Sequence, residues 1–402
     1  MERNLTEGSI FKNIIYFSIP YLLAYFLQTL YGMADLFIIG QFEGVASTTA
    51  VSVGSQVMHM LTVMIVGLAM GATVNIGQAI GARDKKRAAV DTGNTATLFM
   101  MLSVILTVVL YFCVNGIVGI MSVPEEAAAG TAMYLKICFM GIPFITAYNI
   151  ISSIFRGMGD SKSPMYFIAI ACGVNIVLDY IFMGVLHLGP SGAALGTTLS
   201  QTVSVIVALT MFIRGKTGIT VKKDDFKPRK ETMGRLLKIG FPIAMQDGLI
   251  QVAFIIITII ANRRGLTDAA AVGIVEKVIS FLFLVPSSML STVSALGAQN
   301  VGAGKPQQAV AALKYAICIA GGFGLLIAII IQFTAGNVVN LFTNDQAVIC
   351  AGTQYLKGYI WTACLQGSIS ASAAISVPAD GPDIPLSTIL SLLPWCVFLA
   401  CT

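Results

Sequence analysis

Four acidic residues lie within long apolar stretches of this chain: Asp35, Asp179, Asp247 and Glu276. An ionised carboxylate in apolar surroundings costs free energy unless it is paired or binds a cation. Each of the four is therefore a candidate for binding a cation or a proton. The structural alternative is a hydrogen bond that joins neighbouring helices.

The first of these carboxylates has polar neighbours at helical spacing. Gln28, Tyr31 and Asp35 are separated by three and four residues, so a helix places them on one face. Asn175 precedes Asp179 by four residues, which predicts an amide oxygen and a carboxylate pointing the same way.

A third stretch supplies hydroxyl and amide oxygens. Thr197 and Gln201 are four residues apart, and Gly192, Gly196 and Ser200 form a track of small residues on the same predicted helix. Such a track permits close approach of a neighbouring helix.

Together these residues predict a cluster of oxygens for a hard cation or a proton. Asp35 and Asp179 would supply the charge, and Asn175 and Thr197 would supply neutral ligands, for Na⁺ if the cation is sodium.

The second half is less specific. Asp247 is a carboxylate candidate there, with Gln246 and Gln251 as polar alternatives. Glu276 and Lys277 are adjacent, hence about 100° apart around a helix, and cannot pair with each other. Either one could interact with Asp247 from another helix, in a role that is structural or that contacts substrate.

No enzyme chemistry is predicted. The two histidines, His59 and His187, are too few for a conventional metal cluster, and the eight cysteines lack paired or CxxC spacing. No nucleophile, base and orienting group recur at catalytic spacing, and no phosphate-binding glycine loop is present. We therefore expect no cofactor other than a coupling ion.

Composition indicates that these residues lie in a membrane protein. The chain is 56% hydrophobic and 11% charged, whereas a soluble domain has roughly 25% charged residues. Apolar stretches of the length needed to cross a bilayer recur throughout the sequence. We expect about eleven transmembrane helices, near residues 14–39, 48–76, 92–120, 130–155, 164–186, 192–213, 236–261, 269–297, 309–334, 348–376 and, shorter, 384–402.

The distribution of Lys and Arg predicts the orientation. Basic residues follow the second, fourth and sixth spans, near 83–87, 156–162 and 214–238, whereas the first, third and fifth connections have none. By the positive-inside rule these exits and the N-terminus are cytoplasmic; Arg263 and Arg264 are the exception. The polar N-terminus carries no evident cleavable signal.

The chain repeats itself at a shift of about 221 residues. The segment 78–82 falls over 299–303, and Tyr134 falls over Tyr355. Such a period predicts an all-α transporter of two pseudo-symmetric six-helix lobes related as parallel repeats. We expect an N-lobe at 1–215, a cytoplasmic linker at 216–235 and a C-lobe at 236–402.

The second lobe is expected to be incomplete. The images of the fifth and sixth spans would extend to about residue 434, yet the sequence ends at Thr402. From about Val377 the repeat dissolves, which suggests a truncated or altered C-terminus.

The chain resembles the multidrug and toxic compound extrusion (MATE) antiporters. The resemblance covers about residues 10–376. The residues that carry it are Pro20, Asp35, the segment 77–82 (GQAIGA), the segment 155–160 (FRGMGD) and the segment 175–179 (NIVLD).

This resemblance implies a cation-coupled antiporter that exports organic cations, drugs or other amphiphiles by alternating access. Asp35, Asn175, Asp179 and Thr197 would form the N-lobe cation site, and Pro20 a hinge that responds to its occupancy. Alternatives are a lipid-linked precursor flippase of the same superfamily, or a degenerate protein that does not transport. We expect a monomer in a prokaryotic plasma membrane, with lipid and small-molecule partners and no nucleic acid.

Overall fold

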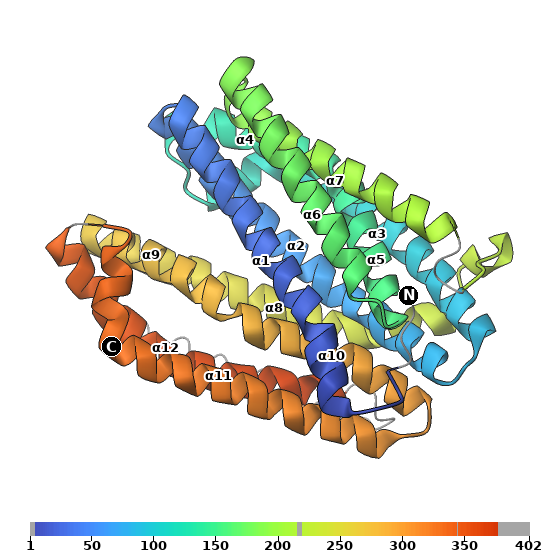
Figure 1. Ribbon diagram of the computed structural model, residues 1–402. Helices are drawn as coiled ribbons and strands as arrows, with labels where there is room; N and C mark the ends of the chain where they lie inside the picture. Colours follow the sequence, from blue (N-terminus) through green and yellow to red (C-terminus); the bar gives the residue numbers. More distant parts are fainter. Residues whose placement is uncertain (1–4, 215–218, 344, 377–402) are drawn as a thin grey trace. The chain divides into compact units, whose positions relative to one another are not determined.

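The structure is a computed structural model that describes residues 5–214, 219–343 and 345–376. Figure 1 shows a chain of long helices with short connections, and the described part contains no β-strand. The predicted all-α class is therefore confirmed. The helices of the first half are α1 (Ile10–Phe42), α2 (Val45–Gly81), α3 (Lys85–Ile120), α4 (Glu125–Met140), α5 (Ile142–Gly157), α6 (Lys162–Asp179), the π-helix η1 (Tyr180–Val185) and α7 (Gly189–Ile213). The later helices are the 3₁₀-helix η2 (Lys223–Phe226), α8 (Lys230–Arg264), α9 (Leu266–Leu282), α10 (Leu284–Gly302), α11 (Pro306–Asn340) and α12 (Gln346–Ser376).

Most of these helices are suited to a bilayer. Within the described residues, eight helices are long and apolar enough to cross a membrane, or nine if the bent pair α4 and α5 is one span. α3 shows why: Met101, Val104, Ile105, Val108 and Phe112 form one helical face, and each is more than half exposed. Exposing such an apolar stripe to water costs free energy, whereas contact with lipid does not. The predicted final span, 384–402, lies outside the described residues.

Two predicted spans are broken by prolines. The stretch predicted as 130–155 is divided at Gly141 into α4 and α5, which meet at 48°. The stretch predicted as 269–297 changes from α9 to α10 at Phe283. Pro143 and Pro286 each follow the break by two or three residues. A proline ring clashes with the carbonyl four residues before it, so it interrupts the preceding turn.

By contrast, Pro20 and Pro242 lie inside α1 and α8, which stay helical on both sides. Each proline removes one backbone hydrogen bond and weakens the helix locally.

The residues group into two compact units by their contacts. Of the described residues, the first unit comprises 23–214 and 219–245, and the second comprises 5–22, 246–343 and 345–376. Two apolar clusters fill the first unit, one around Phe155 and one around Leu135, while a third around Val275 fills the second. In the second unit α11 and α12 run side by side (Figure 1). The division into lobes at 216–235 remains a prediction.

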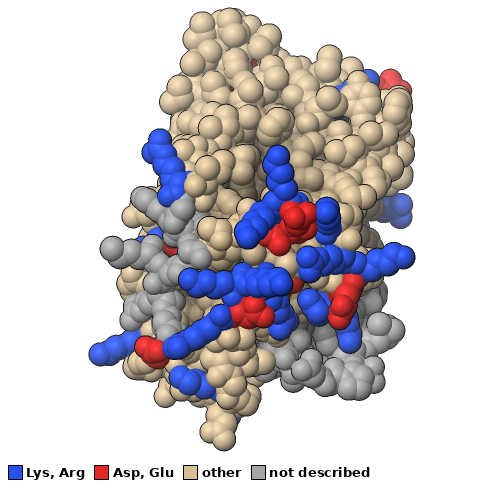
Figure 2. All heavy atoms as spheres, turned by 90° about the vertical axis from the view of Figure 1, so that its right-hand side faces the viewer, with Lys and Arg blue, Asp and Glu red and all other residues tan. Residues whose placement is uncertain are grey.

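Basic side chains gather on one face in the view of Figure 2, with acidic side chains among them. In the first unit, exposed basic residues lie at 83–86, between α2 and α3, and at 222–238, around the start of α8. These are among the residues from which the sequence predicts the cytoplasmic side, and the orientation remains a prediction.

Candidate cation site

Three helices of the first unit bring the predicted site residues together. Asp35 comes from α1, Asn175 and Asp179 from α6, and Thr197 from α7. The Thr197 hydroxyl donates a hydrogen bond to Asp35 Oδ2 at 3.3 Å. Asp35 is 3% exposed, and Asn175 and Asp179 are fully buried.

The two carboxyl groups are close enough to interact with each other, and both interact with the Asn175 amide. Two negative charges held together in low dielectric repel strongly. A bound cation or a shared proton relieves that repulsion, so the electrostatics of the cluster favour binding of a positive charge.

Several oxygens of the cluster are free to accept a ligand. In the described part of the chain, Asp35 Oδ1, both carboxylate oxygens of Asp179 and both polar atoms of the Asn175 amide are buried without a well-formed hydrogen bond. Buried polar atoms are nearly always hydrogen-bonded. Four of these five atoms are oxygens, and a bound cation or a proton would satisfy them.

The donor set suits a hard monovalent cation or a proton. Among the described residues, no group of three or more His, Cys, Asp or Glu side chains is arranged to hold a metal ion. Two carboxylates with an amide and a hydroxyl are oxygen ligands, the kind that Na⁺ takes.

α6 and α7 approach closely because α7 carries glycine where they meet. A Cβ atom on Gly196 would overlap Asp179 Oδ1 and would lie 3.5 Å from Asn175 Nδ2. One turn earlier, a Cβ on Gly192 would lie 3.1 Å from Phe182. The small-residue track thus makes the space that the Asp179 carboxylate occupies.

α6 changes its winding next to the site. Asp179 is its last α-helical residue, and the π-helix η1 follows for six residues. The wider π turn is rare and is often found at functional sites. No signal that we used in the sequence predicted it.

Further polar side chains surround Asp35. Tyr31 interacts with Asp35, about one helical turn away on α1, and with Thr197 of α7. Gln28 is half-buried, and no hydrogen bond joins it to this cluster in the described contacts. Gln201 is 8% exposed, and its Oε1 is buried without a hydrogen bond in the described part.

Sequence reasoning missed Tyr134 and Cys138 of α4. Both are buried, and both lie near enough to Asp35 to feel its charge. A Cβ on Gly54 would overlap the Tyr134 ring, so that glycine makes room for it. The spacing of four between Tyr134 and Cys138 was a readable signal, because it places both on one face of a helix.

The candidates of the second unit are not gathered in the same way. The Thr258 hydroxyl donates a hydrogen bond to Glu276 Oε1 at 3.0 Å, which joins α8 to α9. Asp247 is half-buried, and within the described residues neither it nor Lys277 takes part in an ion pair. Gln246 and Gln251 are half-buried, with no hydrogen bond among the described contacts.

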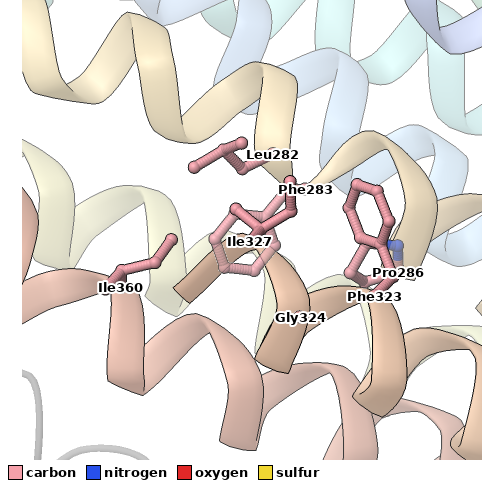
Figure 3. A pocket seen from close by; sticks show the side chains of 7 residues that line it. All are labelled: Leu282, Phe283, Pro286, Phe323, Gly324, Ile327 and Ile360. Atoms are coloured by element: carbon pink, nitrogen blue, oxygen red, sulfur yellow. The ribbon is translucent and has the colours of Figure 1, made fainter. Parts of the chain in front are cut away.

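A small apolar hollow lies where α9 gives way to α10. Figure 3 shows side chains from α9, α10, α11 and α12 around it, and none carries a charge. It brings no candidate residue of the second unit into a site. Its lining consists of Leu282, Phe283, Pro286, Phe323, Gly324, Ile327 and Ile360.

Comparison with known proteins identifies the family. The chain is 27% identical over 407 residues to the probable multidrug resistance protein YoeA of Bacillus subtilis (strain 168), covering 96% of this chain and 88% of that protein. It is 26% identical to the multidrug export protein MepA of Staphylococcus aureus (strain N315), covering 90% and 82%.

Solved structures agree with the sequence relatives. The crystal structure of a MATE protein in complex with MaD3S superposes with a TM-score of 0.86 at 25% identity, over 96% of this chain and 86% of that one. An outward-facing multidrug resistance MATE transporter of the MOP superfamily has the same fold, with a TM-score of 0.87 at 24% identity, again over 96% and 86%. The sequence profile of the MatE family matches residues 20–181 and 242–391, and the chain therefore belongs to that family.

Proposed function

We propose that this protein is a cation-coupled antiporter that exports organic cations, drugs or other amphiphilic small molecules by alternating access. The observation that carries the proposal is the pair of interacting, buried carboxyl groups of Asp35 and Asp179, with unbonded oxygens beside Asn175 and Thr197. Relatives named as multidrug export proteins support the substrate class. MATE proteins are transporters, and no enzymatic step is proposed.

The site supplies a coupling mechanism. With one Na⁺ or H⁺ bound, one of the two negative charges is neutralised, the repulsion between the carboxyl groups is relieved, and α1 is held to α6 and α7. Without it, repulsion favours separation of Asp35 from Asp179. A ligand shifts a conformational equilibrium only by its differential affinity for the two states. Here the cation would bind more tightly to the state in which the Asp35 and Asp179 carboxylates are close together than to the state in which they are apart.

Pro20 links this site to movement of the first helix. It lies on α1 about four turns before Asp35, at a point that lacks one backbone hydrogen bond. We propose that α1 bends there when the occupancy of the site changes. The protein would act as a monomer in the plasma membrane of a prokaryote, with its N-terminus in the cytoplasm.

Ethidium efflux tests the proposed function. We expect cells or proteoliposomes that contain the protein to export ethidium faster when an inward gradient of Na⁺ or H⁺ is imposed, and to slow when that gradient is collapsed. Comparing the two gradients separately identifies the coupling ion. Efflux equal to that of membranes without the protein, under both gradients and with several cationic dyes, would contradict the proposal.

Replacement of Pro20 tests the hinge. Pro20→Ala restores a backbone donor and stiffens α1, so we expect the maximal efflux rate to fall more than the affinity for the dye. Turnover and dye binding should be measured on the same preparation. Unchanged turnover with weakened binding would show that Pro20 shapes a binding surface instead.

A further inference from the structure

The segment that leads into α8 is fastened to α3 by side chains. Asn94 is fully buried on α3; its Nδ2 donates to the Asp225 carbonyl at 3.0 Å, and its Oδ1 accepts from the Arg229 amide at 2.7 Å. The Thr97 hydroxyl donates to the Phe226 carbonyl at 2.8 Å. One asparagine thus clamps two backbone groups of a segment more than 130 residues away in sequence.

A buried charge adds to the clamp. The Asp91 side chain on α3 is 1% exposed and lies 3.5 Å from the Arg235 guanidinium on α8 and 3.7 Å from that of Arg87. Arg235 also pairs with Glu231 at 3.8 Å, but the Glu231 side chain is 89% exposed. Attraction between opposite charges is stronger where one partner is buried in low dielectric than where it is exposed to solvent. The Asp91 pair, more than the Glu231 pair, therefore fixes the position of the start of α8.

Backbone contacts between α2 and α8 complete the attachment. A Cβ on Gly71 would overlap the Leu236 carbonyl, and a Cβ on Gly240 would overlap the Leu68 carbonyl. The two glycines face each other's helices about one turn apart, so α2 and α8 interlock there. Leu236 is 1% exposed as a result.

These contacts end at a proline. By contacts, residues 219–245 belong to the first unit, and α8 passes to the second unit at Gln246, four residues after Pro242. We name residues 219–245 the linker arm. In the sequence repeat, the linker arm is the first part of the second repeat. The second repeat therefore begins with a segment that is attached to helices of the first unit.

The start of the chain has a similar arrangement. Residues 5–22, the N-terminal arm, belong to the second unit and end two residues after Pro20. Asn300 Nδ2 donates to the Leu5 carbonyl at 3.4 Å, and Lys305 Nζ donates to the Thr6 carbonyl at 2.9 Å. As in the linker arm, an asparagine and a second donor hold two successive carbonyls. The carbonyls correspond within about one residue of the repeat, whereas the asparagines do not, because Asn94 falls over Tyr315 and Asn300 falls over Ala79.

We propose that the linker arm is a latch of the transport cycle, with the N-terminal arm as its counterpart. This inference rests on the proposed function, because alternating access rearranges the contacts between the two repeats. The arm then has an engaged state, held by Asn94, Asp91 and the glycine interlock, and a released state in which α8 bends at Pro242. The balance between the two states sets how often the latch opens.

Labelling of a cysteine on the buried face of the linker arm measures how often the arm is released from α2 and α3. Leu236→Cys places a thiol at the interlock, and Leu237→Cys places one on the neighbouring exposed position as a control for reagent access. The purified protein is treated with N-ethylmaleimide, and labelling is followed site by site by peptide mass spectrometry. Native Cys138, fully buried elsewhere in the first unit, reports general unfolding in the same sample.

Removal of the buried partner should release the latch. Asp91→Asn is expected to raise the labelling rate at position 236 about tenfold, because Arg235 loses its attraction to a charge held in low dielectric while the rest of the arm stays in place. Asn94→Ala, which spares the charge, should act in the same direction. Glu231→Gln, which removes the exposed partner of the same arginine, should change the rate less than about twofold.

Three results would overturn the latch: no acceleration at position 236 in folded Asp91→Asn and Asn94→Ala protein, equal acceleration by Glu231→Gln, or a parallel rise at Cys138. Efflux by the unmodified chain is measured alongside. Absent efflux counts against the proposed function, whereas unaltered labelling in a protein that transports counts against the latch alone.

Discussion

Asp35→Asn and Asp179→Asn are each expected to abolish coupled efflux. Either change removes one of the two charges that face the bound cation. At a separation of about 4 Å and an effective dielectric of about 20, one such charge contributes about 4 kcal/mol, which corresponds to roughly a thousandfold in cation affinity. The measurement is ethidium efflux from proteoliposomes under an inward Na⁺ or H⁺ gradient. Glu125→Gln, at the exposed start of α4, is the control and should transport normally.

The same substitutions separate a functional site from a structural one. If the carboxylates repel each other in the absence of a cation, Asp35→Asn should leave the melting temperature in Na⁺-free buffer unchanged or raise it. Added Na⁺ should stabilise the unmodified protein by mass action and leave the variant unaffected, if sodium is the ion. A variant that melts well below the unmodified protein but still couples efflux to the gradient would show that the carboxylates serve the fold.

The spans were predictable because hydropathy alone determines them. The expected ranges 48–76 and 309–334 fall inside α2 and α11, since a bilayer requires about 20 apolar residues whatever their order. The breaks at Gly141 and Phe283 were not predicted. Their signals, Pro143 and Pro286, are local and readable, but an apolar stretch conceals them when only its length is considered.

The site was predictable in parts. Helical spacing placed Asn175 and Asp179 on one face, because that relation depends only on the local periodicity. That α1, α6 and α7 should meet there depends on long-range packing, which spacing within one helix cannot show. The grouping was inferred from the rarity of carboxylates in apolar helices, and the resemblance to a known family implied the same residues. The spacing of four places Tyr134 and Cys138 on one face of a helix, but nothing in the sequence shows that this face lies near Asp35.

The latch was not predictable from the sequence. Asn94 lies 131 residues from the carbonyl that its amide binds. Every residue has a backbone carbonyl, so the sequence does not mark the one that Asn94 binds. A buried asparagine near a helix start reads as an ordinary polar residue. Only the fold shows that its partners are carbonyl and amide groups of a distant segment.

Gly196→Ala is the second substitution with a large expected effect. The added methyl would overlap Asp179 Oδ1, so the carboxylate must turn away from Asn175 or α6 must move from α7. Overpacking of this kind costs about 1–3 kcal/mol of stability. We expect a lower melting temperature and a large loss of efflux, because the displaced carboxylate no longer faces Asp35.

A glycine on α6 provides the matched control. A Cβ on Gly173 would meet nothing within 4 Å, so Gly173→Ala adds the same methyl to a neighbouring helix without a clash. Alanine favours a helix over glycine by up to about 1 kcal/mol. Gly173→Ala should therefore be neutral or stabilising in thermal unfolding, with normal efflux.

A double substitution decides whether Asp179 is the cause. If the cost of Gly196→Ala comes from the carboxylate, it should largely vanish when Asp179→Ala is already present, since the methyl then enters the space that the carboxylate leaves. The non-additivity, measured as melting temperatures of the four proteins, gives the interaction directly. If Gly196→Ala lowers the melting temperature equally with and without Asp179→Ala, the clash lies elsewhere on α6. Gly196 would then serve helix packing without positioning the carboxylate of the cation site.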